Sequence, residues 1–200
     1  MRTTFALLIT TGLTLATSAQ TSIAQTSSNQ KSKYAGQENR ALKSLSAKEI
    51  TEFEQGEGMG MAKVAELNGV PGPTHLLKIK DKIGLTTAQA AKVQSLFDQM
   101  KVDAIVLGKQ VIAQEYELEK RFQTDIPNAD QLKTILTRLG ATRAQLRFVH
   151  LATHLQTMKI LTDTQIASYN QLRGYSPKDP CANIPAGRDA EMWKKHNGCE

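Results

Sequence analysis

The feature that most constrains the fold is a run of apolar residues whose spacing alternates between four and three positions. The run begins at Val93 and ends at Phe122, with Gln114 filling one position and Gly108 as its only helix-weakening residue. Such heptad-like spacing lines one side of a single helix with apolar side chains, and that side must pack lengthwise on another helix. The chain is therefore expected to contain one long helix that ends before Asp125.

A second apolar periodicity follows after a connection of only a few residues. Asn128 is a good N-cap residue, and Gln131 stands three positions later. The apolar residues of this second helix are Leu132, Ile135, Leu139, Leu146, Val149, Leu151 and Leu155. Because the connection is short, the two helices are expected to form a long antiparallel hairpin over about 86–160.

Shorter helices are expected at both ends of this hairpin. Ser46 and Glu49 form a capping box that predicts a helix over about 47–67, a short helix is expected over 75–83, and a last one ends at Gly174. No segment shows the alternating pattern of a strand, so the predicted fold class is all-α, a helical hairpin with shorter flanking helices. A hairpin this long has a thin core, so we expect its seam to continue across a homodimer interface.

The first residues have the pattern of an export signal. Arg2 is followed by an apolar stretch over 5–15 that is too short to span a bilayer, and Ser22-Ile23-Ala24 is a small-x-small cleavage site. We expect a signal peptide over 1–24, with Thr17-Ser18-Ala19 as the alternative cleavage site. The expected location is a periplasm-like compartment.

Composition divides the rest of the chain into three parts. Residues 25–45 are rich in Ser, Gln, Asn and Lys and predict a flexible linker, residues 46–175 carry the helical domain, and residues 176–200 form an irregular tail. The tail holds both cysteines, Cys181 and Cys199. In an exported chain an even number of cysteines predicts a disulfide.

Charge and motif content argue against several classes of function. The net charge is +6, but the positive residues are spread along the chain, so nucleic acid is not an expected partner. No stretch after the signal has the length of a transmembrane helix, so the protein is not expected to be embedded in a membrane. Motifs of the forms G-x-S-x-G and H-E-x-x-H are absent, as is a glycine-rich phosphate loop, and we expect no enzymatic activity.

Two pentapeptides of the form L-T-x-x-Q stand at the two ends of the expected hairpin. They comprise Leu85, Thr86 and Gln89, and Leu161, Thr162 and Gln165. Each has a capping explanation, because the Thr can cap a helix, the Gln can complete the capping box and the Leu can act as a hydrophobic staple. Two such motifs flanking a helical hairpin, behind a signal peptide, resemble the Spy/CpxP family and its heavy-metal-resistance relatives such as CnrX. The resemblance covers about 75–175.

This resemblance implies a small periplasmic helical protein that forms an antiparallel, cradle-shaped dimer. Spy-like members bind unfolded proteins without ATP, CpxP-like members damp an envelope-stress sensor kinase, and CnrX-like members bind transition-metal ions through His, Glu and Met. These activities share one scaffold, so the resemblance by itself does not choose among them.

His150 and His154 are the residues best suited to a metal ion. Their spacing of four places both imidazoles on one helix face, Met158 adds a thioether four positions later, and His75 can join from the short helix. The resemblance to CnrX-like proteins supports zinc, copper, nickel or cobalt at these residues, although no cofactor is required for the fold. Met59 is expected to pack between helices or to serve an adaptable apolar surface.

Arg143 and Arg147 fall on the same helical stripe as the two histidines. Fixed cations oppose a divalent ion, so a solvated basic face is the alternative reading of this stripe. Together with Lys101 and Lys109, these arginines alternate with apolar residues and are expected to bind unfolded client proteins. The expected function is ATP-independent holding of unfolded proteins, and the alternatives are a heavy-metal sensor or resistance protein and an adaptor of a membrane sensor kinase.

Overall fold

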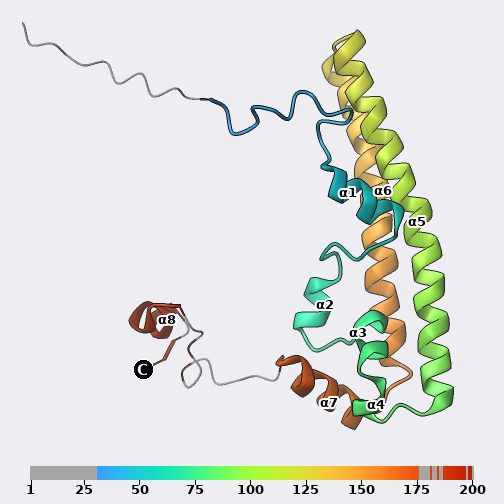
Figure 1. Cartoon of the computed structure of the whole chain (residues 1–200), viewed down its shortest axis with the longest axis vertical. Helices are drawn as coiled ribbons and strands as arrows, with labels where there is room; N and C mark the ends of the chain where they lie inside the picture. Colours follow the sequence, from blue (N-terminus) through green and yellow to red (C-terminus); the bar gives the residue numbers. More distant parts are fainter. Residues whose placement is uncertain (1–30, 176–180, 182–183, 185–186, 197, 200) are drawn as a thin grey trace, which may run out of the picture. The chain divides into compact units, whose positions relative to one another are not determined.

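The computed structural model describes residues 31–175, 181, 184, 187–196, 198 and 199. The chain divides into two compact units, Met1–Glu38 and Asn39–Glu200, and every helix of the described residues belongs to the second. The fold is all-helical, and the described ranges contain no strand (Figure 1). The helices are α1 (Ala47–Glu54), α2 (Lys63–Leu67), α3 (Pro73–Lys78), α4 (Lys80–Ile83), α5 (Thr87–Thr124), α6 (Ala129–Met158), α7 (Asp163–Arg173) and α8 (Ala190–His196).

Some expectations fall on parts of the chain that are not described. The expected signal peptide over 1–24 lies outside the described residues, as do residues 25–30 of the linker and 176–180 of the tail. Cys181 and Cys199 are described, and a disulfide joins them. Among the described residues, no helix combines the length and the apolar character that crossing a membrane requires.

The long helices α5 and α6 run side by side and form the centre of the fold (Figure 1). Polar contacts also join them: Gln114 donates from Nε2 to Thr142 Oγ1 over 3.0 Å, and Arg143 donates to Glu115 over 2.6 Å. The buried residues of α5 are Val93, Met100, Ala104, Gly108, Val111 and Glu115. The predicted seam is therefore confirmed from Val93 to Val111.

Two apolar residues of the predicted periodic patterns, one on each long helix, are exposed in the single chain. Leu155 is 59% exposed, because it stands nine residues after the buried Leu146 and therefore about half a turn around the helix from it. Phe122 is 52% exposed, because it lies beyond the main core cluster, whose last member on α5 is Val111. Both residues remain available on the surface of the central pair.

The predicted helix over 47–67 is divided into α1 and α2 by the non-helical segment 55–62. Three residues of this segment have positive φ values: Gly56 at 62°, Met59 at 44° and Gly60 at 75°. A Cβ atom at Gly56 would also lie only 3.0 Å from the Lys101 carbonyl oxygen of α5. The glycines thus end α1 and let the chain turn close against α5. The helix predicted over 75–83 is likewise interrupted, at Ile79 between α3 and α4.

The predicted C-terminal boundary of the flexible linker over 25–45 is too late in the chain, because its last residues pack against the helical domain. Leu42 and Leu45 are buried in the core cluster that also contains Phe53 of α1. Ser44 donates a hydrogen bond from Oγ to Glu115 over 2.8 Å, and Lys43 forms an ion pair with Glu119. Two leucines in a polar segment are too weak a periodic signal to predict packing, but their burial places residues 42–45 within the helical body.

Both L-T-x-x-Q motifs form the capping boxes that the sequence predicts. Thr86 caps α5 and Thr162 caps α7, and each accepts a hydrogen bond from the backbone amide of its own Gln. Ser46 and Asn128 cap α1 and α6 in the same way, with Glu49 and Gln131 as the reciprocal partners. Four helix starts are therefore fixed by residues adjacent to them in the sequence.

The glutamines of the two motifs also bind each other. Gln89 donates from Nε2 to Gln165 Oε1 over 2.9 Å, and Gln165 donates from Nε2 to Gln89 Oε1 over 3.0 Å. Each amide also donates to the carbonyl just before the other motif, Gln89 to Ile160 and Gln165 to Gly84. The motifs thus form one two-way link that ties the start of α5 to the start of α7.

This link predicts different costs for two otherwise similar substitutions. Gln131→Ala removes only a capping box and is expected to lower the free energy of unfolding by about 0.5–1 kcal/mol. Gln89→Ala also removes the bonds to Gln165 and Ile160, so a loss of about 2–3 kcal/mol is expected. Urea unfolding of these variants, with Gln165→Ala to complete a double-mutant cycle, measures the coupling at about 1 kcal/mol. Equal losses at Gln89 and Gln131, with no coupling, would contradict the link.

Candidate functional site

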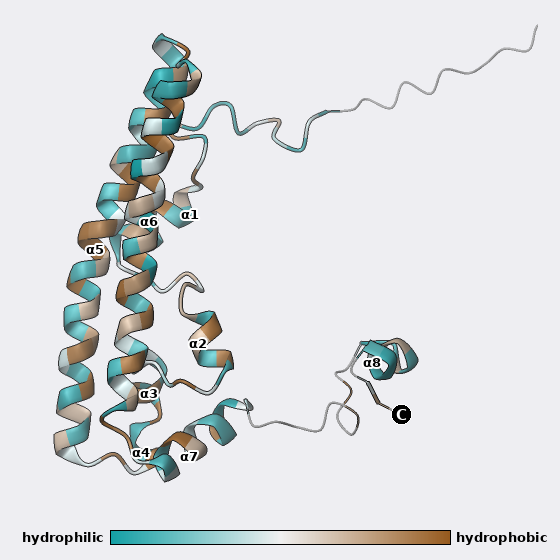
Figure 2. Cartoon of the chain, turned by 180° about the vertical axis from the view of Figure 1, so that it is seen from behind, coloured by the Kyte–Doolittle hydropathy of each residue, from teal (hydrophilic) through white to brown (hydrophobic). Residues whose placement is uncertain are grey.

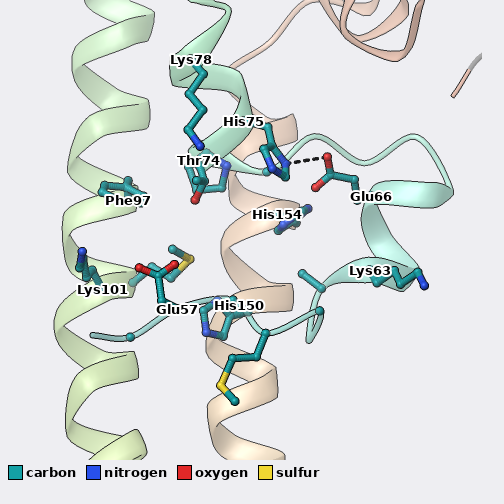
Figure 3. A pocket seen from close by; sticks show the side chains of 18 of the residues that line it. Glu57, Lys63, Glu66, Thr74, His75, Lys78, Phe97, Lys101, His150 and His154 are labelled. Atoms are coloured by element: carbon teal, nitrogen blue, oxygen red, sulfur yellow. Dashed lines mark hydrogen bonds and ion pairs between the residues drawn. The ribbon is translucent and has the colours of Figure 1, made fainter. Parts of the chain in front are cut away.

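A pocket of about 610 Å³ lies between the central pair and the segment over 56–75 (Figure 3). The turn over 56–60, helices α2 and α3, and the facing sides of α5 and α6 all contribute to its lining. Its volume falls in the range of about 300–1,000 Å³ that is typical of small-molecule sites. The lining contains titratable side chains of Glu, His, Lys and Tyr, which makes this pocket the candidate functional site.

The structure brings three of the four predicted metal ligands to this pocket. His75 reaches it from α3, and His150 and His154 reach it from α6 (Figure 3). Met158 is half-buried on α6 and does not line the pocket. Met59 and Met100 line the pocket instead. The residues predicted from the sequence therefore include three histidines that meet in the pocket and one methionine that lies outside its lining.

His150 is a buried imidazole whose Nε2 atom makes no hydrogen bond within the described residues. Only 3% of the residue is exposed. Burial lowers the pKa of His150 below its usual value, and the neighbouring His154 adds to this effect, while the carboxylate of Glu57 opposes it. His150 is therefore a polar group that the fold itself leaves incompletely satisfied.

His154 is held in one orientation by backbone groups on the far side of the pocket. Its Nδ1 lies 2.9 Å from the Val70 carbonyl oxygen. Its Nε2 lies so close to Gly72 that a Cβ atom there would be only 2.3 Å away. Gly72 is thus needed for close approach of the chain to the imidazole, and the ring has little freedom to turn toward a ligand.

Glu66 of α2 is the polar centre of the wall of the pocket. Its Oε1 atom accepts from Tyr169 over 2.7 Å, from Arg173 over 3.1 Å and from Tyr175 over 3.2 Å, and it lies 2.8 Å from His75 Nδ1. Burial raises the pKa of Glu66, but the Tyr169 hydrogen bond and the adjacent His75 and Arg173 outweigh it, so the pKa lies below its usual value. Glu66 is thus a charged carboxylate that anchors α7 and α3 to α2.

The charges that line the pocket do not favour a divalent cation. Among the described residues, no group of three or more His, Cys, Asp or Glu residues is arranged to hold a metal ion. Lys63, Lys78 and Lys101 line the pocket, whereas its carboxylates are Glu66, which is already engaged, and Glu57. The positive groups that oppose a metal ion are therefore lysines of the pocket, and not the two arginines that the sequence suggested.

The predicted stripe of arginines and histidines is not a single exposed face. His150 and His154 turn inward, while Arg147 is exposed. Arg143 is an anchored cation: it pairs with the buried Glu115 over 2.6 Å and lies over the Phe53 ring at 5.5 Å. Reversing its charge would place two carboxylates together, so Arg143 cannot serve as a neutral probe of a surface function.

The other two predicted client-binding cations lie in different surroundings. Lys101 is half-buried at the pocket, 6.0 Å from the Phe97 ring, and Lys109 is exposed on α5. The four predicted cations therefore do not form one surface. Lys109 and Arg147 are the two that are exposed and form no ion pair with any described residue.

Besides Phe122, six large apolar residues of α5 and α6 are exposed, and hydrophobic residues recur among hydrophilic ones along both helices (Figure 2). We call these residues the outer apolar set; they are Val102, Val106, Tyr116, Leu136, Phe148 and Leu155. Phe148 is the most exposed of them, at 69%. The sequence pattern includes Leu155 among the periodic apolar residues of the second helix and does not single out Phe148, because this pattern alone does not tell which apolar side faces α5.

The buried His150 predicts a specific pH dependence of stability. Its pKa is lowered in the folded state, so the unfolded chain binds its proton first as pH falls through about 6.5. The free energy of unfolding should therefore fall between about pH 7 and pH 5. His150→Phe should flatten this slope in urea unfolding, whereas His196→Gln, on α8, should preserve it. An unchanged slope in His150→Phe would contradict the prediction; the shifted carboxylates Glu49, Glu66 and Glu119 lose their contribution only at lower pH.

Comparison of the whole chain with models of protein families, with curated proteins and with solved structures finds no match in any of the three.

Proposed function

We propose that this chain is an exported stress-response protein that holds unfolded proteins without ATP, as Spy-like members of the Spy/CpxP family do. The observation that carries the proposal is the outer apolar set. Exposed Val, Leu and Phe side chains on a rigid pair of helices offer short-lived contacts to any partly unfolded chain. The proposal includes a periplasmic location and the family resemblance of the two L-T-x-x-Q motifs.

Positive charge stands next to these apolar residues. Val102, Val106 and Lys109 lie within about 60° of one another around α5, whereas Arg147 and Phe148 point about 100° apart around α6. Free cations speed the encounter with chains that carry acidic residues, and the apolar neighbours then provide contact area. Alternation of the two suits partners without a defined shape better than it suits one rigid partner.

The same surface supports a homodimer of helical hairpins as the active form. Val102, Val106 and Tyr116 lie opposite the buried residues of α5, and Phe148 and Leu155 lie opposite those of α6, so each long helix has exposed apolar residues on the side away from its core. A second copy can cover part of that area and leave the remainder as a concave binding surface. Sedimentation velocity tests this part of the proposal: a stable monomer at all accessible concentrations would remove the dimer but not the holding activity.

Two alternatives of other classes stay predictions. A metal-sensing role draws on the meeting of His75, His150 and His154 in one pocket, and the lysines of the pocket weigh against it. Calorimetric titration with zinc, copper, nickel and cobalt ions decides it, because His150→Ala with His154→Ala should abolish any binding at these residues. The role of adaptor for a membrane sensor kinase predicts binding to an isolated sensor domain, which pull-down with purified proteins tests.

The holding function predicts suppression of client aggregation without nucleotide. Residues 25–200 should reduce light scattering by a chemically reduced model client, and the effect should weaken as salt rises because the encounter is partly electrostatic. Phe148→Ser with Leu155→Ser should reduce suppression several-fold, and Lys109→Glu with Arg147→Glu should reduce it mainly at low salt. All four residues are exposed, so the free energy of unfolding should change by about 0.5 kcal/mol or less per site.

Leu172→Ser is the matched control for this experiment. Leu172 is 49% exposed, like the outer apolar set, but it belongs to α7 and not to the central pair. Its substitution should leave suppression unchanged. The absence of suppression at several-fold molar excess, in both low and moderate salt, would overturn the proposed function.

A further inference from the structure

The pocket beside α3 combines apolar walls with an excess of free positive charge. Phe97 and Met100 of α5, together with Met59, supply apolar surface on one side, and Leu67 and Pro73 supply it on the other. A pocket of about 610 Å³ with such walls can hold the apolar body of a small organic molecule. The apolar lining alone does not say what kind of polar group such a molecule carries.

The charged residues of the pocket indicate the sign of the charge that a ligand would carry. Lys63, Lys78 and Lys101 line it, and none of them forms an ion pair with any residue in the described part of the chain. Glu66 is already bonded to Tyr169, Arg173 and Tyr175, which leaves Glu57 as the one uncommitted carboxylate of the lining. Three free ammonium groups against one carboxylate select an anion over a cation.

A second, independent observation points to an occupant. The Nε2 atom of His150 is buried without a hydrogen-bond partner among the described residues, and the residue lines the pocket (Figure 3). Buried polar atoms in native proteins are rarely left unpaired, so a water molecule or a polar atom of a ligand that reaches this imidazole would complete its bonding. Glu57 lies near enough to influence this imidazole electrostatically.

We propose that this pocket binds a small organic anion that joins an apolar body to a carboxylate. The apolar body lies against Phe97 and Met100, the carboxylate meets an ammonium group of the lysines that surround the pocket (Figure 3), and a polar atom of the ligand pairs with His150. This site lies on the inner side of the central pair and is separate from the outer apolar set, so the proposal does not depend on the holding function.

Matched probes test the chemistry of the ligand. Isothermal titration of residues 25–200 is carried out below micelle formation with decanoate, decanol and decyltrimethylammonium, which share one apolar chain and differ in the charge of the head group. Decanoate should bind saturably at one site per chain and about tenfold more tightly than decanol, which corresponds to about 1.4 kcal/mol. Decyltrimethylammonium should show no saturable binding, and acetate, which lacks the apolar body, should also show none.

Paired lysine variants place the binding in the pocket. Lys63→Gln with Lys78→Gln should weaken decanoate binding about tenfold and leave decanol binding unchanged. Lys120→Gln with Lys133→Gln removes the same charge from exposed positions outside the pocket and should change the affinity less than twofold. Phe148→Ser with Leu155→Ser, which alters only the outer apolar set, should also leave it unchanged.

Several results would overturn the proposal. Equal affinity for decanoate and decanol would show that the charge of the ligand is not recognised. An equal loss in the two lysine pairs would show that only the net charge of the protein matters, and loss in the Phe148→Ser, Leu155→Ser variant would place the ligand on the outer surface. Because Lys63 and Lys78 are exposed and unpaired, circular dichroism of their double variant should match the parent, which keeps a loss of binding interpretable.

Discussion

The packing of α2, α3 and α7 depends on four polar groups that surround one carboxylate oxygen, Oε1 of Glu66. Tyr169, Arg173, Tyr175 and His75 all lie within 3.2 Å of Oε1, and they come from α3, α7 and the residue after α7's cap. A buried carboxylate that loses such partners costs about 3–5 kcal/mol. The arrangement therefore specifies one position of α2 relative to α3 and α7, and with it the wall of the pocket.

The Gln89–Gln165 link acts on the same region from the other side. It fixes the starts of α5 and α7, while Glu66 fixes the end of α7 to α2 and α3. Between these two polar contacts lies a small apolar cluster of Leu76, Ile83, Val93 and Tyr169. The short helices that enclose the pocket are thus positioned by polar contacts with defined geometry as well as by buried apolar area. These helices leave the outer sides of α5 and α6 uncovered.

The sequence predicted the elements whose signals are local. Capping boxes at Ser46, Thr86, Asn128 and Thr162 need only residues three positions apart, and the α5 seam repeats within a single helix. The Glu66 cluster could not be predicted in this way, because Tyr169 and Tyr175 stand 103 and 109 positions from Glu66. The same limit explains why the burial of His150 and His154 was not predicted: they share a stripe of α6 with Arg147, but the segment over 56–75 covers the histidines and leaves Arg147 exposed.

Glu66 holds α7 and the segment over 56–75 in place around the pocket. Native-state hydrogen exchange of Glu66→Gln tests it most directly, because this change keeps the shape of the side chain and removes its charge. Exchange should become faster at the amides of α2, α3 and α7, while the amides at the middle of α5 and α6 stay unchanged. Unaltered exchange in α7, or an equal increase across α5 and α6, would contradict it.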